Sequence, residues 1–329
     1  MGCDWRPLVE LVFRHRRFLL TTHMRPDGDG LGSMKGLARA LRQLGKQVRL
    51  VIPSGLSSRY DFLDPEREIR SFVPPGDEFR DAEVLVILDT GTWNQLGGMA
   101  DFVRDLPARK VVIDHHVTQD DLGAQPFVDT SAEAVGRLTY ELVRALGVTV
   151  TPEIAAPLFV ALAMDTGWFR HGNVTPETFT LAHALAAAGA RPDLLYQQLY
   201  DQNTLARMRL TGVMLERLTI VGGGRVAYST IRRADYEQLG ASPLDSEDLV
   251  NATLSLAGVV AGVLFLEQPR GGIKVSLRSR EGVNIGKVAE QLGGGGHPQA
   301  AGAIVPGALD EVQARVLQAV EREAAAQPG

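Results

Sequence analysis

The sequence predicts a two-domain α/β protein, in which a domain with a parallel sheet is followed by a smaller α+β domain. Three observations carry this prediction. The chain has 329 residues, a length that suits two domains. In the first half, short apolar segments alternate with stretches that have apolar residues at helical spacing, which is typical of a parallel sheet covered by helices. Beyond residue 218 the pattern changes to strands joined by turns.

The first domain is predicted over residues 1–190. Its strands are expected at "RFLLTTH", "VRLVI", "EVLVILDTG" and "KVVIDHH", most of which stop at acidic or histidine residues. Helices are expected over "SMKGLARALRQLGK" and "WNQLGGMADFVRDL", and the next helix is expected to start at a capping box of Thr130 and Glu133. The segment from Thr151 is predicted to be a helix that ends at Asp165, and "TPETF" starts another.

Residues 191–218 are polar and helix-permissive, and they are predicted to form a connecting helix or linker. The second domain is predicted over residues 219–329. It is expected to contain a strand "RVAYSTI", a helix from about Ser246, and two strands "VVAGVLFLEQ" and "GIKVSLRSR" that "PRGG" joins as a hairpin. The glycine-rich stretch "LGGGGHPQAAG" closes this domain.

Composition excludes several classes of function. The net charge of −5 gives no cationic field for long duplex DNA, because such binding depends on neutralising phosphates. The single cysteine, Cys3, excludes an internal disulfide framework and fits a reducing cytoplasm. No targeting segment is recognised, and the longest mostly apolar run, residues 252–266, is too short for a membrane span. A cytoplasmic protein without a membrane partner is therefore expected.

Acidic and histidine side chains gather where the predicted strands and helices end. Because open α/β sheets bind ligands beyond the carboxyl ends of their strands, these side chains are expected to converge. They are His23, Asp27, Asp29, Asp89, Asp114, His115 and His116 at strand ends, with Asp165 at a helix end.

Hydrolysis of a phosphate ester is served by two divalent cations, which require about six ligands, at least one of them a bridging carboxylate. The sequence offers His23, Asp27, Asp29, Asp89, His115 and Asp165. Mixed imidazole and carboxylate ligation favours two Mn²⁺, with Mg²⁺ or Co²⁺ as substitutes. Each residue alone has an ordinary explanation as a turn residue, a helix cap or a core histidine. The joint occurrence of four such motifs at element ends favours the metal site.

These motifs also resemble those of a known family. "HMRPDGDGLGS", "VILDTG", "VVIDHH" and "LAMDTG" resemble the four metal motifs of the DHH phosphoesterase family, and "SLRS" with "GGGHPQAAG" resembles its DHH-associated substrate domain. The resemblance covers residues 18–305. Within the family, the motif spellings are most similar to the NrnA type, a bifunctional oligoribonuclease and 3′-phosphoadenosine-5′-phosphate (pAp) phosphatase.

The resemblance implies a role for each motif residue in the first domain. It assigns one Mn²⁺ to His23 and Asp27, the other to Asp29, His115 and Asp165, and a bridging position to Asp89. It also implies two catalytic residues. Asp114 would orient a ligand through a hydrogen bond, and His116 would contact the scissile phosphate or assist its leaving oxygen.

The resemblance further implies that the substrate lies in the cleft between the two domains, with the second domain binding its terminal phosphate. The implied contacts are Arg278, Ser279, Gly294, Gly295, Gly296 and His297. Arg278 would bind phosphate in bidentate fashion, and the glycine N–H groups would approach phosphate closely at the start of a following helix. A flexible loop is the ordinary alternative for such a glycine run.

The implied activity is Mn²⁺-dependent hydrolysis of short RNA or DNA oligonucleotides to 5′-mononucleotides, together with dephosphorylation of pAp. A homodimer is an assembly that the resemblance allows. One alternative is a phosphodiesterase acting on cyclic di-AMP or linear dinucleotides, which present the same chemical groups. An inorganic pyrophosphatase shares the metal motifs but has no use for the second domain. A nucleotide sensor without turnover would not need all six metal positions intact.

Overall fold

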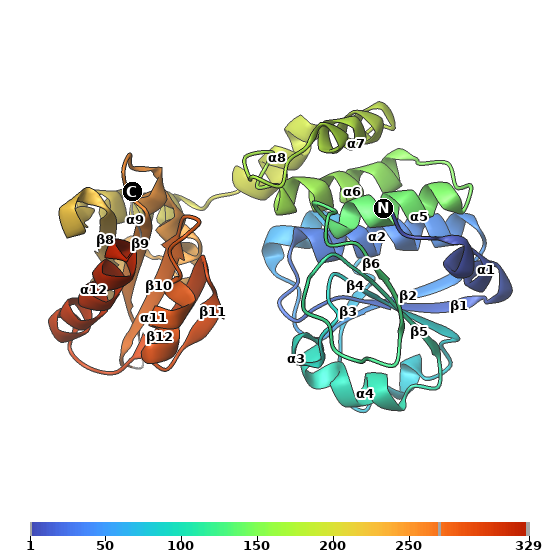
Figure 1. Ribbon diagram of the computed structural model, residues 1–329, viewed down its shortest axis with the longest axis horizontal. Coiled ribbons are helices and arrows are strands. Elements are labelled where there is room, and N and C mark those ends of the chain that lie inside the picture. The colour runs from blue at the N-terminus through green and yellow to red at the C-terminus, as the bar shows by residue number, and fades with distance from the viewer. Residues whose placement is uncertain (1, 269–270, 327–329) are drawn as a thin grey trace. The chain divides into compact units, whose positions relative to one another are not determined.

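The computed structural model describes residues 2–268 and 271–326, and the chain divides into two units, Met1–Gln202 and Asn203–Gly329 (Figure 1). Each unit contains a six-stranded sheet. The predicted fold class, a parallel-sheet α/β unit followed by an α+β unit, is confirmed. Among the described residues, no helix combines the length and the apolar character that a membrane span requires.

The sheet of the first unit has the order β3-β2-β1-β4-β5-β6, and every neighbouring pair is parallel. Its strands are β1 (Arg17–Thr21), β2 (Gln47–Ile52), β3 (Ile69–Ser71), β4 (Val84–Leu88), β5 (Arg109–Asp114) and β6 (Gln125–Val128). The strand order reverses between β1 and β4. In open α/β sheets this reversal opens a crevice at the carboxyl ends of the strands, and the predicted metal residues follow β1, β4 and β5 there.

Helices cover both faces of this sheet (Figure 1). The alternating side chains of β1 show the two layers, because Phe18 and Leu20 pack in one core with α2, α5 and α6, whereas Leu19 packs in another with α4. The helices are α1 (Arg6–Arg14), α2 (Gly28–Gln43), α3 (Trp93–Leu96), α4 (Ala100–Asp105), α5 (Val135–Ala145), α6 (Pro152–Asp165), α7 (Pro176–Ala187) and α8 (Pro192–Tyr200), with 3₁₀ turns η1 (Ser58–Leu63), η2 (Asp77–Phe79) and η3 (Gly97–Met99).

Glycines bring α2 unusually close to α6. A Cβ atom on Gly32 would lie 2.3 Å from the carbonyl oxygen of Pro157, and one on Gly28 would lie 2.3 Å from Cγ of Met164. Only glycine at these two positions leaves room for this helix pair. The close packing places the first turn of α2 beside the last turn of α6, which carry Asp29 and Asp165.

Several predicted helix boundaries in this unit were wrong. Helix α2 starts at Gly28, five residues before the predicted segment, because the Asp27 carboxylate caps it by accepting from the N–H groups of Asp29 and Gly30. The segment from Trp93 is broken into α3, η3 and α4 at Gly97, whose φ of 48° leaves the helical region. The capping box of Thr130 and Glu133 does not form, since α5 starts at Val135 and is capped from a distant residue described below.

The second unit has the sheet order β11-β12-β10-β9-β8-β7, antiparallel except for the parallel pair β8 and β9. Its strands are β7 (Thr219–Val221), β8 (Val226–Ile231), β9 (Ala261–Glu267), β10 (Ile273–Ser279), β11 (Gly295–His297) and β12 (Ala300–Val305). Its helices are α9 (Leu205–Glu216), α10 (Arg233–Leu239), α11 (Ile285–Gln291) and α12 (Leu309–Ala325), with 3₁₀ turns η4 (Gly222–Gly224), η5 (Pro243–Ser246) and η6 (Leu249–Ser255). Helices α11 and α12 cover one face, and α9 and α10 contribute to the core of the other.

The segment 191–218 differs from the predicted connecting helix, because it forms two helices. Leu195 and Leu199 of α8 pack into the core of the first unit, whereas Leu210 and Met214 of α9 pack into the second. Thr204 caps the start of α9 by accepting a hydrogen bond from the N–H group of Arg207. Helices α8 and α9 are therefore not continuous.

Two further predictions in the second unit were wrong. The helix expected from about Ser246 is the 3₁₀ turn η6, in which Thr253 packs so tightly against β9 that a Cβ on Gly262 would lie 1.7 Å from its hydroxyl oxygen. The glycine run is followed directly by a strand and not by a helix, because Gly295 and Gly296 pair with β12 as part of the edge strand β11. A helix dipole therefore does not contribute at that position.

Candidate metal centre

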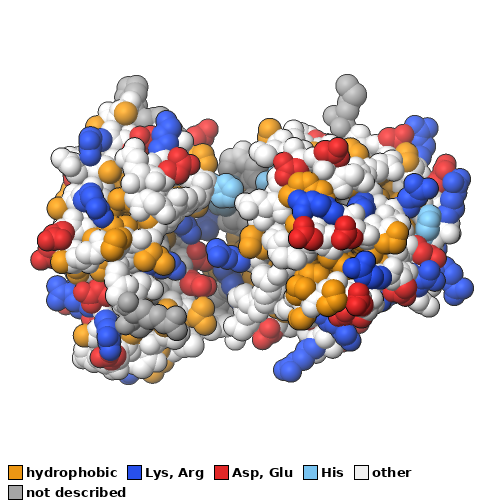
Figure 2. Space-filling view, turned by 90° about the horizontal axis from the view of Figure 1, so that it is seen from below, with side chains coloured by type: hydrophobic (Ala, Val, Ile, Leu, Met, Phe, Trp, Pro, Cys, Tyr) orange, Lys and Arg blue, Asp and Glu red, His pale blue; other side chains and the backbone are white. Residues whose placement is uncertain are grey.

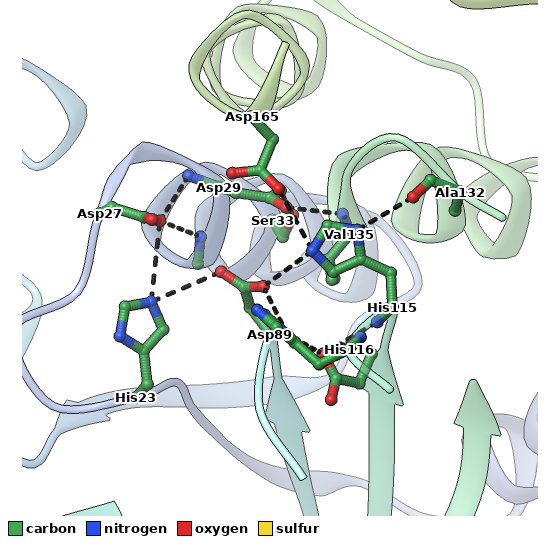
Figure 3. A network of polar contacts seen from close by, with 12 residues as sticks. His23, Asp27, Asp29, Ser33, Asp89, His115, His116, Ala132, Val135 and Asp165 are labelled. Atoms are coloured by element: carbon green, nitrogen blue, oxygen red, sulfur yellow. Dashed lines mark hydrogen bonds and ion pairs between the residues drawn. The ribbon is translucent and has the colours of Figure 1, made fainter. Parts of the chain in front are cut away.

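Residues from four separate segments meet beyond the carboxyl ends of β1, β4 and β5 (Figure 3). The loop after β1 and the start of α2 contribute His23, Asp27 and Asp29. Asp89 follows β4, His115 and His116 follow β5, and Asp165 is the last residue of α6. The structure thus brings together all six residues predicted as metal ligands.

His23, Asp27 and Asp89 form the first group. His23 Nε2 lies 3.7 Å from Asp27 Oδ1 and 3.5 Å from Asp89 Oδ2. One ligand atom from each of the three residues can be chosen so that all three lie within 4.8 Å of one another. This spacing suits a cation placed between them.

Asp29, His115 and Asp165 form the second group under the same criterion. His115 Nε2 lies 3.2 Å from Asp165 Oδ2, and the other ring nitrogen, Nδ1, lies 2.9 Å from the carbonyl oxygen of Ala132. Because a carbonyl only accepts, Nδ1 carries the proton of a neutral ring, and Nε2 is left with its lone pair facing the cluster. That tautomer is the one a metal ligand needs.

Asp89 lies between the two groups. Its Oδ2 faces His23, and its Oδ1 lies 3.7 Å from His115 Nε2. Asp89 is 4% exposed, and its Oδ1 is among the few buried side-chain oxygens of the described residues that lack a hydrogen-bond partner. A buried carboxylate oxygen without a donor is costly, so a cation at this position would satisfy it. The residues therefore fit a metal pair that Asp89 bridges.

The backbone supports this position of Asp89. Its φ of 63° is left-handed, a conformation that costs free energy for a residue other than glycine and that occurs often at functional sites. A Cβ on Gly30 would lie 2.3 Å from the hydroxyl oxygen of Thr22 and 3.3 Å from Asp89 Oδ2, so this position needs glycine. Both features hold the carboxylate against α2.

The electrostatics of the cluster also favour cations. Burial disfavours the charged form of His23, but hydrogen bonds and charge from Asp27 and Asp89 outweigh it and raise its pKa to about 11. The pKa of His115 is likewise raised to about 10, mainly by Asp165 and Asp29 against the effect of burial. Burial and neighbouring carboxylates raise the pKa of Asp89 to about 6 and that of Asp29 well above its usual range. The crowded negative charge thus favours protons on Asp89 and Asp29, and divalent cations would neutralise the same charge.

Besides its place in the cluster, Asp29 caps the start of helix α5. Its Oδ2 accepts from the N–H group of Val135 at 2.6 Å, and its Oδ1 accepts from Gly136 N–H at 2.9 Å and from the Ser33 hydroxyl at 3.1 Å. The residue before α5, Ala134, has no side chain that could do this. Asp29 therefore satisfies the free donors at the start of α5, which is the reason that the local capping box is not needed.

The two residues predicted as catalytic form a hydrogen-bonded pair. Asp114 is completely buried at the end of β5, and its Oδ1 accepts from His116 Nδ1 at 2.8 Å. The His116 side chain is 53% exposed. The bond to Asp114 raises the pKa of His116, and the ring turns its Nε2 away from that carboxylate.

In the second unit, Arg278 and His297 lie in one row across three strands. Arg278 of β10 pairs with Ala300 of β12, which pairs with His297 of β11. Directly opposed residues point to the same face of a sheet, so the side chains of Arg278 and His297 lie on one face. Because two strand spacings separate them, their Cα atoms are about 10 Å apart. We call these two residues the basic row.

The remaining predicted substrate residues differ in their surroundings. Gly294, Gly295 and Gly296 are exposed beside the basic row. Ser279, in contrast, is 7% exposed, and its hydroxyl donates to the carbonyl oxygen of Val283 at 2.5 Å. That hydroxyl is already used within the unit, so the structure gives it no open face toward a ligand.

Sequence reasoning missed the partners that hold these residues. Arg278 donates from Nε to Asn251 Oδ1 at 3.0 Å, and its Nη2 lies 3.4 Å from Asp248 Oδ1. Gln119 donates to Asp114 Oδ2 at 2.6 Å. These contacts join positions by tertiary structure, and no spacing in the sequence identifies them.

One more acidic group, formed by Asp64, Glu66 and Glu68, has the spacing of a metal site. Three cations of α2 already pair with it. The buried Lys35 has its Nζ 2.8 Å from Asp64 and 3.1 Å from Glu68, while Arg39 pairs with Glu66 and Arg42 with Glu68. This group therefore ties α2 to the segment before β3 and is not a second metal centre.

Both units of the chain match models of known domain families. Residues 17–162 match the model of the DHH family, N-terminal domain, and residues 223–326 match that of the DHHA1 domain. The chain is 35% identical to the bifunctional oligoribonuclease and PAP phosphatase NrnA of Thermus thermophilus, over 92% of this chain and 89% of that protein. It is 27% identical to the Bacillus subtilis protein of the same name, over 91% and 92%. The cyclic-di-AMP phosphodiesterase PdeA of Listeria monocytogenes is 25% identical over 95% of this chain but only 49% of its own length.

Solved structures share the fold. An exopolyphosphatase-related protein from Bacteroides fragilis superposes with a TM-score of 0.90 at 23% identity, covering 97% of this chain and 95% of that one. A structure of the exonuclease RecJ bound to manganese has a TM-score of 0.51 at 17% identity, covering 100% and 96%.

Proposed function

The chain belongs to the DHH family, and from that membership we propose that it is a metal-dependent phosphoesterase that hydrolyses short oligonucleotides to 5′-mononucleotides and dephosphorylates pAp. The observation that carries the proposal is the convergence of His23, Asp27, Asp29, Asp89, His115 and Asp165 around the buried, unpartnered oxygen of Asp89. Relatives named as bifunctional oligoribonuclease and PAP phosphatase support the choice of substrates.

We propose that His23 and Asp27 bind one Mn²⁺, that Asp29, His115 and Asp165 bind the other, and that Asp89 binds both. Two such cations would lower the pKa of a bound water and neutralise charge on the phosphate. The neutral tautomer of His115, fixed by the Ala132 carbonyl, suits this role.

His116 is proposed to act on the substrate. Its Nδ1 is held by Asp114, so the exposed side of the ring presents Nε2. An imidazole held in this way can hydrogen bond a phosphate oxygen or give a proton to the departing oxygen. Asp114 orients the ring and stabilises its charged form, which the raised pKa of His116 reflects.

The basic row of the second unit is proposed to bind a terminal phosphate of the substrate. The Arg278 side chain is 26% exposed, and Asn251 holds its guanidinium, which reduces the entropy lost when it binds an anion. His297 and the exposed N–H groups near Gly294, Gly295 and Gly296 would add hydrogen bonds.

The charge distribution favours short substrates over long duplexes. The net charge is −5, and on the face drawn in Figure 2 the basic and acidic side chains of the described residues are interspersed on both units. Duplex binding depends on many simultaneous phosphate contacts, which such a face does not offer. A cytoplasmic location and a homodimer stay predictions.

A panel of substrates tests the proposal. The purified protein with Mn²⁺ is given a dinucleotide, pAp, cyclic di-AMP and inorganic pyrophosphate, and the products are separated by chromatography. The proposal expects mononucleotides from the dinucleotide and AMP from pAp. Preferential opening of cyclic di-AMP would instead favour the activity named for the Listeria relative. Nucleotide binding without turnover, with and without Mn²⁺, would make the protein a sensor.

A further inference from the structure

The Asp114 carboxylate is held by four donors. Its Oδ1 accepts from the backbone N–H of His115 at 2.8 Å, from that of His116 at 3.3 Å and from His116 Nδ1 at 2.8 Å. All three belong to the next two residues of the chain. The only donor to Oδ2 among the described residues is the amide of Gln119, at 2.6 Å. Gln119 therefore fixes Oδ2, the oxygen to which His115 and His116 donate no hydrogen bond.

The orientation of the Gln119 amide follows from its surroundings. Its nitrogen faces two acceptors, Asp114 Oδ2 and the carbonyl oxygen of His116, the latter at 3.0 Å. The opposite orientation would place the amide oxygen against both of them. The NH₂ group must therefore point toward Asp114.

Gly91 makes room for this side chain. A Cβ on Gly91 would lie 1.7 Å from Gln119 Oε1 and 2.4 Å from its Cδ, so any larger residue would displace the amide. The backbone around it is tied as well, since Asp120 N–H donates to the Gly91 carbonyl at 2.8 Å and Trp93 N–H donates to Asp120 Oδ2 at 2.8 Å. Gln119 is thus wedged between the loop after β5 and the loop after β4, which carries Asp89.

This arrangement bears on His116. A carboxylate held at one oxygen can rotate about its Cβ–Cγ bond, and the imidazole that it orients would move with it. A carboxylate held at both oxygens fixes the ring. We propose that Gln119 is a positioning residue, which locks the Asp114 carboxylate and through it the His116 imidazole against the substrate phosphate. The inference rests on the proposed function of His116.

The test compares Gln119→Leu, which keeps the bulk but removes the donor, with Gln119→Glu, which places a carboxylate against Asp114. Gln43→Leu is the matched control, because Gln43 is an exposed glutamine whose amide lies 3.5 Å from Thr151, away from the cluster. Both Gln119 variants are expected to lower kcat on a dinucleotide by about 10- to 100-fold. KM should stay within about twofold, because no binding contact is lost. Mn²⁺ content should match wild type. The melting temperature should fall by a few degrees, because the buried Asp114 Oδ2 loses its donor, and both variants should stay folded at the assay temperature.

A second variant tests the same geometry from the other side. Gly91→Ala should lower kcat in the wild-type background by displacing the Gln119 side chain. The same change in a Gln119→Ala background, where that side chain is absent, should lower it far less. If the effects of Gly91→Ala and Gln119→Ala on kcat are additive, Gly91 does not act by making room for the Gln119 side chain.

A readout without turnover separates this inference from the proposed function. In metal-free protein with labelled histidines, the Nδ1–H proton of His116 gives a nuclear magnetic resonance signal, which a His116→Gln variant assigns. Gln119→Leu should shift or broaden that signal, and Gln43→Leu should not. An unchanged signal together with an unchanged kcat overturns the inference, as does a loss of Mn²⁺ or of folding that accounts for the lower rate. If wild type hydrolyses no phosphoester, the proposed function fails, and the signal still decides the role of Gln119.

Discussion

The candidate metal centre of the first unit and the basic row of the second unit hold their side chains in different ways. Asp29 and Asp114 are completely buried, and each accepts at least three hydrogen bonds from the segments around it. His297 and the neighbouring glycines lie exposed on an edge hairpin, and Arg278 is held by side chains of one turn. The first arrangement suits chemistry that requires fixed geometry, and the second suits reversible binding.

Loss of the Asp89 carboxylate, which is proposed to bridge the two cations, should have the largest effect. Asp89→Ala is expected to lower kcat/KM by more than about 100-fold, because loss of a residue that only hydrogen bonds to a metal ligand can already cost up to about 100-fold. Bound Mn²⁺ should fall by more than one equivalent, measured by metal analysis of the folded variant. Asp101→Ala is the control, since Asp101 is 91% exposed and pairs only with Arg104 among the described residues. Full Mn²⁺ occupancy in Asp89→Ala would contradict a bridging role.

Asp29 should be the metal-centre residue whose loss most affects the fold. In metal-free protein, Asp29→Ala is expected to lower the free energy of unfolding by about 1–2 kcal/mol, because it removes the cap of α5. Asp165→Ala is the matched variant, as it removes a carboxylate from the same cluster without uncapping a helix. Denaturant unfolding in the presence of a chelator measures both. Equal losses of stability would refute the capping role.

Substitutions in the basic row should change binding while leaving the metals in place. Arg278→Ala is expected to raise KM for a dinucleotide by about 10-fold with little change in kcat, as for a charged hydrogen bond that contributes uniformly to binding. Lys274→Ala is the control, because Lys274 is exposed on the same face of β10, four residues away. A fall in Mn²⁺ content in Arg278→Ala would show that the two regions are not separate in function.

The last expected effect is a dependence of stability on pH, to which the two histidines of the proposed metal centre contribute most. The pKa values of His23 and His115 are raised to about 11 and about 10, so between pH 6.5 and those values the folded metal-free protein holds protons that the unfolded chain has lost. Its stability should therefore fall as pH rises from 6 to 8. Mn²⁺ must displace these protons, so its stabilising effect should grow over the same range. Melting temperatures with Mn²⁺ and with a chelator, at pH 6 and pH 8, give both slopes. A stabilising effect that shrinks toward pH 8 would argue against His23 and His115 as ligands.

The convergence of the proposed metal ligands could be predicted because these residues obey a local rule. His23, Asp89 and His115 each follow an apolar strand, and the carboxyl ends of parallel strands meet at one edge of the sheet. The convergence could therefore be inferred without a structure. Asp165 could be added because the apolar segment that begins at Thr151 was predicted to be a helix, and Asp165 lies at its end.

The errors occurred where distant parts of the chain decide the local structure. The start of α5 is capped by Asp29, which is 106 residues away from Val135, so the local Thr130 and Glu133 pattern was misleading. The glycine run carries no side-chain pattern, so its pairing with β12, in which Gly295 lies opposite Gly302, could not be read from the sequence. Gln119 and Asn251 act through tertiary contacts that leave no periodic signal in the sequence.

The account depends most directly on metal-dependent hydrolysis of a short oligonucleotide. Protein stripped of metal by a chelator and then dialysed is titrated with Mn²⁺, while bound metal and the rate of dinucleotide hydrolysis are followed together. We expect no hydrolysis without metal, and a rate that saturates as two equivalents bind to the residues around Asp89. Undiminished hydrolysis in the metal-free protein, or none after two equivalents have bound, would contradict the account.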